Sequence, residues 1–124
     1  MKKVITADHA PAAIGPYSHG ISVGDLFFTS GQIPINPATG AVETTTIEEQ
    51  SEQVCKNLQA VLEATGSSLD KAVKTTCFLR HMDDFAAFNG IYAKYFTGKP
   101  ARSCVAAKQL PKDVLVEVEV IAEK

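Results

Sequence analysis

The stretch "DVLVEVEVIAE", residues 113–123, has the most regular alternation of side chains in this chain. Successive side chains of a β-strand point to opposite faces, so a period of two predicts a strand with two different surfaces. One face carries a row of valines: Val114, Val116, Val118 and Val120. The other face mixes apolar and acidic side chains: Leu115, Glu117, Glu119 and Ile121. The stretch therefore predicts a sheet strand, and the rest of the chain must supply its neighbours.

A hairpin, two helices and two further strands are predicted around this strand. The hairpin lies within residues 19–31, where Gly24, suited to a positive φ, and Asp25 separate two β-rich runs. A proline-punctuated loop follows. The remaining elements are a helix from Thr46 to Gly66, a strand over 72–80, a helix from Asp83 or Asp84 to Gly98, and a strand over 101–107. This order indicates an α+β sandwich with both helices on one face of the sheet, so self-association is the obvious way to cover the other face.

Each predicted helix has a start signal and an apolar stripe. Thr46 and Glu49 fit a capping box, and Gly66 stands where a C′ glycine would. The first stripe comprises Ile47, Val54, Leu58, Val61, Leu62 and Thr65; the second comprises Phe85, Phe88, Tyr92, Tyr95 and Phe96. Gly90 inside the second helix costs about 1 kcal/mol relative to alanine, which suggests a role in close packing.

Composition limits the function classes. The 124 residues make one domain, 1–124, with net charge −2 and no basic cluster beyond Lys2-Lys3, which argues against a dedicated nucleic-acid or anionic-membrane binder. The apolar run Val4-Ile5 is too short for a signal peptide, and no apolar stretch could span a membrane. Three cysteines without CxxC spacing indicate reduced thiols in a cytoplasmic setting. No metal-binding or nucleotide-binding motif is present.

The stretch "PARSCVAA", residues 100–107, places Arg102 and Cys104 on one face of a strand, about 7 Å apart. An arginine held on a rigid strand offers a planar fork for a carboxylate, but it could equally form an ion pair, for example with Glu117 or Glu119.

Cys104 could be a nucleophile activated by one of the histidines His9, His19 and His81, yet no recognisable Cys-His signature exists. The simpler interpretation of the same residue is a small buried thiol that packs like a hydrophobic side chain.

Two acidic residues share the mixed face of the last strand. Glu117 and Glu119 project in parallel, which does not suit glycoside hydrolysis, and both could belong to a solvated polar face. However, Leu115 and Ile121 flank them, and a carboxylate in a half-apolar environment is where a general base with a raised pKa is found.

Weaker signals come from a loop, a turn and a helix. The loop "TSGQ", residues 29–32, offers the Ser30 hydroxyl and the Gly31 backbone to a ligand. Tyr17 follows a Gly-Pro turn, where its ring could form the wall of a pocket. Asn89 in the second helix could be an ordinary polar-face residue.

Four segments together carry a family resemblance: "APAAIGPYSHG" (10–20), "TSGQIPINPATG" (29–40), "VKTTCFLRHMDDFAAFN" (73–89) and "PARSCVAAKQLPKDVLVEVEVIA" (100–122). The chain resembles the Rid/YjgF family over nearly its whole length, and within it the RidA subgroup of 2-iminobutanoate/2-iminopropanoate deaminases. The resemblance implies a chorismate-mutase-like α+β fold and a homotrimer in which the sheets form a central β-barrel and the ligand sites lie between subunits.

The resemblance also implies an activity and residue roles. The activity is hydrolysis of reactive 2-imino or enamine acids to 2-oxo acids and ammonia, without a metal or organic cofactor. Arg102 would bind the substrate carboxylate, Glu117 would activate water, and the Cys104 backbone would contact the ligand. Four further residues would line the pocket: Tyr17, Ser30, Gly31 and Asn89. The segment Thr-Gly-Lys, residues 97–99, is shorter than in some relatives, which is expected to alter the pocket rim.

Two other functions remain open at this point. The same arginine could serve a non-catalytic module that binds or senses 2-oxo acids. RNA cleavage, an activity sometimes attributed to this family, is disfavoured by the acidic balance of the chain.

Overall fold

The computed structural model describes residues 1–124 as one six-stranded sheet with two α-helices. The strands are β1 (Lys3–Ile5), β2 (Gly20–Val23), β3 (Leu26–Thr29), β4 (Ala72–Leu79), β5 (Ala101–Ala106) and β6 (Val116–Glu123). The helices are α1 (Ile47–Glu63) and α2 (Phe85–Tyr95), with short 3₁₀ turns η1 (Leu69–Lys71), η2 (Met82–Asp84) and η3 (Pro111–Asp113). The sheet order is β1-β2-β3-β6-β4-β5, and only β4 and β5 pair in parallel. The α+β class predicted from the sequence is confirmed.

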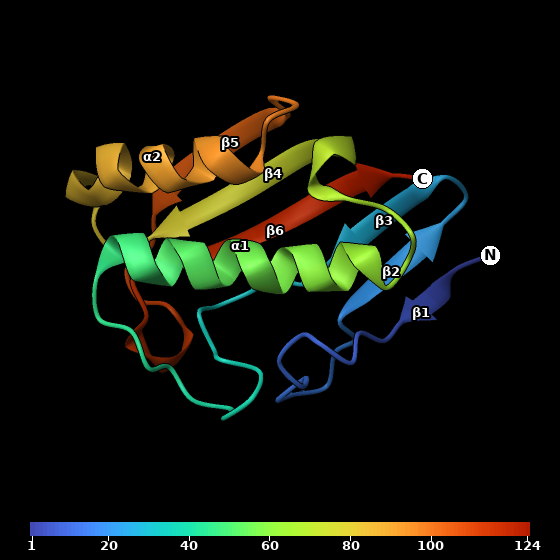
Figure 1. The fold of residues 1–124 in the computed structure, drawn as a ribbon, viewed down its shortest axis with the longest axis horizontal. Coiled ribbons are helices and arrows are strands. Elements are labelled where there is room, and N and C mark those ends of the chain that lie inside the picture. The colour runs from blue at the N-terminus through green and yellow to red at the C-terminus, as the bar shows by residue number, and fades with distance from the viewer.

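Both helices cover the same face of the sheet, as Figure 1 shows. The valine row of β6 faces them, since Val116, Val118 and Val120 are at most 1% exposed. The predicted stripe of α1 packs against this row, with Val54, Leu58, Val61 and Leu62 fully buried. Helix α2 contributes Phe88 and Tyr92 to the same core, and Phe96 joins it directly after the helix ends. The strand that the sequence marked most clearly is therefore central in the sheet.

The signals at both ends of α1 act as predicted. Thr46 Oγ1 accepts a hydrogen bond from the backbone N–H of Glu49 (3.2 Å), and its hydroxyl donates to the Glu49 carboxylate (2.9 Å). At the other end, the N–H groups of Gly66 and Ser67 donate to the carbonyls of Glu63 and Leu62. This is the Schellman arrangement, with Gly66 at φ +84°.

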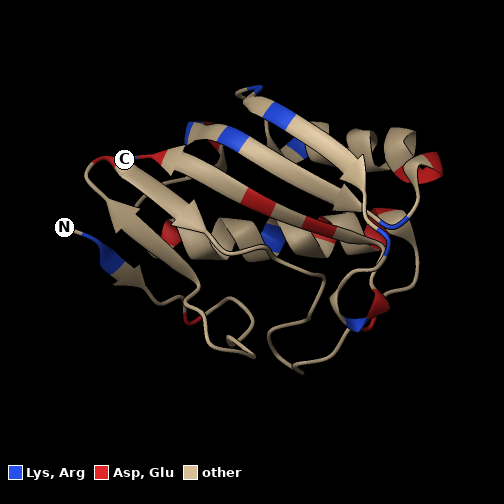
Figure 2. Cartoon of the chain, turned by 180° about the vertical axis from the view of Figure 1, so that it is seen from behind, with Lys and Arg blue, Asp and Glu red and all other residues tan.

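The opposite sheet face has no helix across it, as Figure 2 shows from behind. Strand register puts Glu117, Glu119 and Ile121 of β6 on this face. It also carries five exposed apolar side chains: Val4, Val23, Leu26, Phe28 and Val105. Exposed apolar side chains gathered on one face are typical of an interaction surface, which agrees with the expected self-association. Self-association, the trimer and the central barrel all stay predictions.

The sequence analysis missed one strand, and two of its expectations need correction. Strand β1 was not predicted, because three residues are too few to show a period of two. Strand β6 begins at Val116 rather than at Asp113, since Lys112 and Asp113 adopt left-handed backbone conformations within the η3 turn. Gly90 does not serve close packing, because a Cβ there would meet nothing within 4 Å.

Candidate functional site

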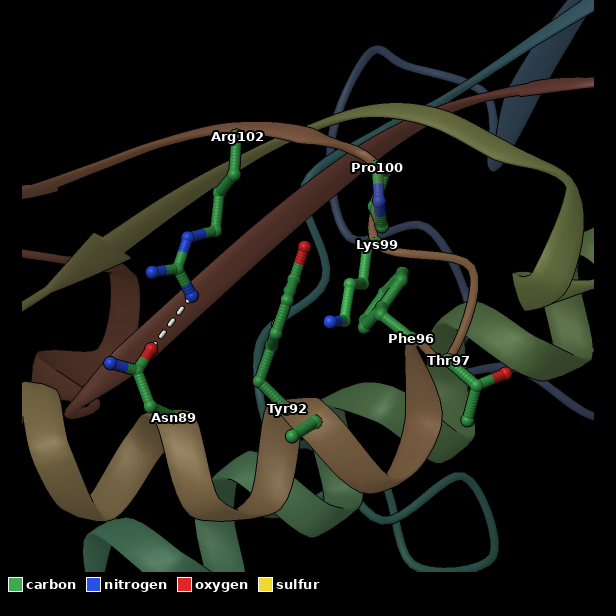
Figure 3. Close-up of a pocket in the computed structure, with 8 residues that line it drawn as sticks. Asn89, Tyr92, Phe96, Thr97, Lys99, Pro100 and Arg102 are labelled. Carbon is green, nitrogen blue, oxygen red and sulfur yellow. Dashed lines mark hydrogen bonds between the residues drawn. The ribbon is translucent and has the colours of Figure 1, made fainter.

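Arg102 lies in a pocket of about 500 Å³ between β5 and α2 (Figure 3). Its Nη1 donates a 2.7 Å hydrogen bond to Asn89 Oδ1, so the predicted pair of Arg102 and Asn89 comes together. The guanidinium carbon lies 4.8 Å from the ring centroid of Tyr92 and 5.3 Å from that of Phe85. These contacts fix one edge and one face of the planar group. The rest of the guanidinium remains available to a ligand.

No carboxylate neutralises this arginine. The ion pairs of the structure are Arg80–Asp113 and Lys94–Glu52, and neither involves the pocket. The alternative that Arg102 pairs with Glu117 or Glu119 does not hold within one chain, because strand register places those residues on the opposite sheet face. An unpaired guanidinium with fixed orientation is suited to a carboxylate ligand.

Tyr92, whose ring contacts the Arg102 guanidinium, is itself held in place by two contacts. Its hydroxyl shares a 2.8 Å hydrogen bond with Thr75, a buried residue of β4 that lies opposite Arg102 in the strand register. The ring stacks on Phe96 with centroids 4.5 Å apart. Burial raises the pKa of the Tyr92 hydroxyl, which keeps the group neutral beside the guanidinium.

Cys104 is half-buried on the helix side of β5, two residues beyond Arg102. Burial raises the pKa of its thiol, and the nearby Arg102 opposes that shift only in part. The protonated form that results is a poor nucleophile. The structure thus favours the packing interpretation of Cys104 that the sequence left open.

The histidines serve other purposes. Both ring nitrogens of His19 contact the N-terminal segment, Nδ1 accepting from the Ala7 N–H (3.0 Å) and Nε2 lying 2.7 Å from the Pro11 carbonyl. His9 and His81 are exposed.

Glu117 lies in a second pocket, of about 330 Å³, on the uncovered face of the sheet. The lining brings together four of the predicted site residues: Tyr17, Ser30, Gly31 and Glu117. The Ser30 hydroxyl donates to the Ser18 carbonyl (2.6 Å), which ties the loop after β3 to the segment before β2. Tyr17 is 46% exposed at the rim, and its hydroxyl accepts from the Ile14 N–H (3.3 Å).

Gly31 lets the Glu117 carboxylate lie against the backbone. Gln32 and Val118 exchange two backbone hydrogen bonds, of 2.9 and 3.2 Å, and this bridge sets the preceding Gly31 beside Glu117. A Cβ on Gly31 would overlap the Glu117 carboxylate. The glycine therefore leaves room for this close approach, and any side chain at position 31 would make the Glu117 carboxylate shift.

The environment of Glu117 is the one expected for a general base. Burial is the main cause that raises its carboxyl pKa above the ordinary value, and the nearby Glu119 charge raises it further. No hydrogen bond to the carboxylate opposes these effects. Glu119 itself is exposed, as the sequence interpretation allowed.

The two pockets lie on opposite faces of the sheet. Arg102 and Cys104 pair with Thr75 and Cys77 on the helix side, whereas Glu117 pairs with Phe78 on the uncovered side. The candidate residues thus form two groups, Asn89 with Arg102 and Tyr17 with Ser30, Gly31 and Glu117. One chain alone does not bring them into a single site.

Sequence reasoning did not assign a site role to Phe85 and Tyr92, which contact Arg102, or to Lys99, which lines the pocket with it. Phe85 and Tyr92 were predicted only as members of an apolar helix stripe. Their helical spacing serves core packing and contact with Arg102 alike, so the pattern does not distinguish the two roles. Lys99 was noticed only as part of a short segment, yet it lines the pocket at φ +52°. The expected place of residues 97–99 at the pocket rim was the available signal.

No group of three or more His, Cys, Asp or Glu side chains is placed to hold a metal ion. Neither α-helix has the length and apolar character needed to cross a bilayer.

Fold and pockets together define a single-domain α+β protein with a cationic pocket and a carboxylate pocket on opposite faces of one sheet. Residues 7–124 match the family model described as endoribonuclease L-PSP, and the chain belongs to this family, the Rid/YjgF family. It is 50% identical to a RutC family protein of Pyrococcus horikoshii, over 100% of this chain and 99% of the relative. It is 46% identical to a 2-iminobutanoate/2-iminopropanoate deaminase of Escherichia coli, over 98% of each chain. The solved structure of E. coli TdcF with bound serine superposes with a TM-score of 0.94 at 40% identity, covering 98% of each chain.

Proposed function

We propose that this protein hydrolyses reactive 2-imino acids, such as 2-iminopropanoate and 2-iminobutanoate, to 2-oxo acids and ammonia. The observation that carries the proposal is the unpaired guanidinium of Arg102, fixed by Asn89 and two aromatic rings in an open pocket. A 2-imino acid presents a carboxylate next to the reacting carbon. Binding that carboxylate therefore positions the C=N bond directly.

The chemistry needs one further group, and Glu117 can supply it. Its carboxylate would take a proton from a water molecule as the water oxygen bonds to the imine carbon and the C=N electron pair moves to nitrogen. When the imine nitrogen is protonated, this addition gives a neutral carbinolamine, and the same carboxyl group would return the proton to its nitrogen. As the C–N bond then breaks and ammonia leaves, an oxygen electron pair forms the C=O bond and the hydroxyl proton passes to the Glu117 carboxylate. A carboxylate with a raised pKa suits both directions of this transfer.

We further propose that a neighbouring subunit completes the site. Arg102 and Glu117 of one chain are separated by the sheet, so the pair must come from two chains to act on one substrate. The uncovered sheet face offers both exposed apolar side chains and opposite charges, Lys74 and Glu119, for self-association. A closed homotrimer with three composite sites is the assembly proposed.

The relatives support this proposal. One protein of similar sequence is named as a 2-iminobutanoate/2-iminopropanoate deaminase, and TdcF was solved with serine, an amino acid that carries the same carboxylate. The family model is named for RNA cleavage. This chain has net charge −2 and no basic stripe for a phosphate backbone, so we favour the small carboxylate as its ligand.

A coupled assay tests the activity. A serine or threonine dehydratase would generate the imine, and release of pyruvate or 2-oxobutanoate would be followed with and without the purified protein. We expect faster release with wild-type protein and about 100-fold less stimulation with Arg102→Ala, near the upper end of what loss of a hydrogen bond to a charged group costs. Lys56→Met, an exposed change on α1, is the matched control.

A second function fits the separation of the two pockets. The arginine pocket of a single chain could bind a 2-oxo acid without turnover. In that case 2-oxobutanoate would bind through Arg102, release of product would not be accelerated, and the hydrolytic proposal would be wrong.

A further inference from the structure

The arginine pocket contains a second cation. Lys99 lines the same cavity as Arg102, on the loop that enters β5, and Figure 3 shows both side chains among the lining residues. The cavity lining includes no Asp or Glu, and neither cation has a carboxylate within 4.0 Å in the chain. Two unpaired positive charges in one pocket repel each other unless an anion binds between them.

The structure presents Lys99 from an anchored loop, not from a free surface segment. Thr97 donates a 2.6 Å hydrogen bond to the Asp70 carboxylate in η1. Gly98 approaches the Asp70 carbonyl so closely that a Cβ would lie 2.9 Å from that oxygen. Pro100 follows and restricts the chain on the other side.

Lys99 also occupies an unusual backbone conformation. Its φ of +52° is the left-handed region, although the glycine that would adopt it without cost is the preceding residue. A glycine at position 99 would adopt this conformation without strain, but the pocket would then lose the lysine ammonium group. Local strain of this kind concentrates at ligand sites.

The size of the cavity indicates what the two cations bind. Lys99 and Arg102 are three residues apart in the chain, which limits the distance between their backbones to at most about 10 Å, and both side chains line one cavity. The cavity of about 500 Å³ is larger than a three- or four-carbon imino acid needs, even where a neighbouring subunit covers part of it. The stacked rings of Tyr92 and Phe96 offer an apolar wall for a short methylene chain.

We propose that Lys99 binds a second carboxylate, so that the site prefers 2-imino and 2-oxo acids whose side chain is itself acidic. This inference rests on the proposed role of Arg102, which takes the carboxylate next to the reacting carbon. Lys99 takes the distal carboxylate at the rim. The preferred substrate class is thus the 2-imino dicarboxylic acids.

Calorimetric binding of two probes of similar length tests this preference. 2-Oxoglutarate carries a distal carboxylate, and 2-oxohexanoate ends in a methyl group. We expect wild-type protein to bind 2-oxoglutarate about fivefold more tightly, the value of one partly exposed ion pair. The ratio of the two affinities should fall to about one in Lys99→Met and when ionic strength is raised, because the distal contact is a screened charge pair. Lys99→Arg and the control Lys56→Met should keep the preference.

The outcomes separate the two proposals. An equal affinity of wild-type protein for both probes, or a preference that survives Lys99→Met, overturns the role of Lys99 alone. Binding of neither probe, or binding that Arg102→Ala does not weaken, overturns the role of Arg102 and with it the inference. Thermal unfolding of Lys99→Met at the wild-type temperature shows that a lost preference does not come from a damaged fold.

Discussion

The two pockets hold their charged groups in opposite ways. Arg102 is fixed by side chains of α2, with one hydrogen bond and two ring contacts to its guanidinium. Glu117 is placed by a backbone bridge and a glycine, and nothing donates to its carboxylate. The first arrangement stabilises a charge and orients it for binding. The second leaves a carboxylate poorly solvated and therefore ready to accept a proton. The comparison thus matches the two roles proposed for these residues, binding for Arg102 and proton transfer for Glu117.

Glu117→Gln should have the largest effect on activity. Loss of a general acid–base group lowers the rate by about 10²- to 10⁴-fold, while ligand binding through Arg102 persists. The wild-type pH profile should fall on the acid side, with a midpoint above that of an ordinary glutamate, because the raised pKa keeps the carboxyl protonated there. Rates from pH 4 to 9 for both proteins would measure this.

The same variant should be more stable than wild type at neutral pH. The folded-state pKa of Glu117 lies above its unfolded value, so ionisation opposes folding. This penalty is absent below the unfolded pKa and develops as pH rises through the folded pKa. Thermal unfolding of Glu117→Gln should therefore show a stability gain at pH 7 that vanishes in acid. A variant that is both inactive and less stable at pH 7 would contradict the account of this half-site.

Gly31→Ala should have an intermediate effect. The new methyl group would displace the Glu117 carboxylate, and misplacement of a catalytic group by about 1 Å costs up to about 100-fold in rate. Steady-state kinetics should show that the loss is mainly in kcat, since the arginine pocket is untouched. A change in KM alone would mean that Gly31 contacts the substrate and does not position Glu117.

Gly90→Ala should have the smallest effect and serves as the matched control. The added Cβ meets nothing within 4 Å, and the helix interior favours alanine by about 0.5–1 kcal/mol. Denaturant unfolding should show this gain, with kinetics equal to those of wild type. A loss of stability would show that α2 packs more tightly at this position than the structure indicates.

The fold was largely predictable because its strongest signals are local. The alternation of β6, the capping box at Thr46 and the Schellman glycine at Gly66 all act within a few residues. Strand β1 was missed because its existence depends on pairing with β2, a contact across fifteen or more residues of chain.

The candidate site was predictable as a set of residues but not as a geometry. The residues came from motifs, whereas their separation onto two sheet faces depends on the parallel register of β4 with β5. The alternation of side chains along one strand places Arg102 on the same face as Cys104, and Glu117 on the same face as Glu119. It does not say which face of one strand matches which face of another strand in the sheet. Contacts such as Tyr92 beneath Arg102 follow only from packing of α2 on the sheet.

Subunit mixing shows whether Arg102 and Glu117 of different subunits act on one substrate. Arg102→Ala and Glu117→Gln proteins, each inactive alone, would be unfolded together, refolded as a mixture and assayed. Random assembly into a closed ring with composite sites should leave about a quarter of the sites with both residues intact, and so about a quarter of wild-type activity. No recovery from a mixture that has reassembled would show that both residues act within one chain, and the composite site would be ruled out.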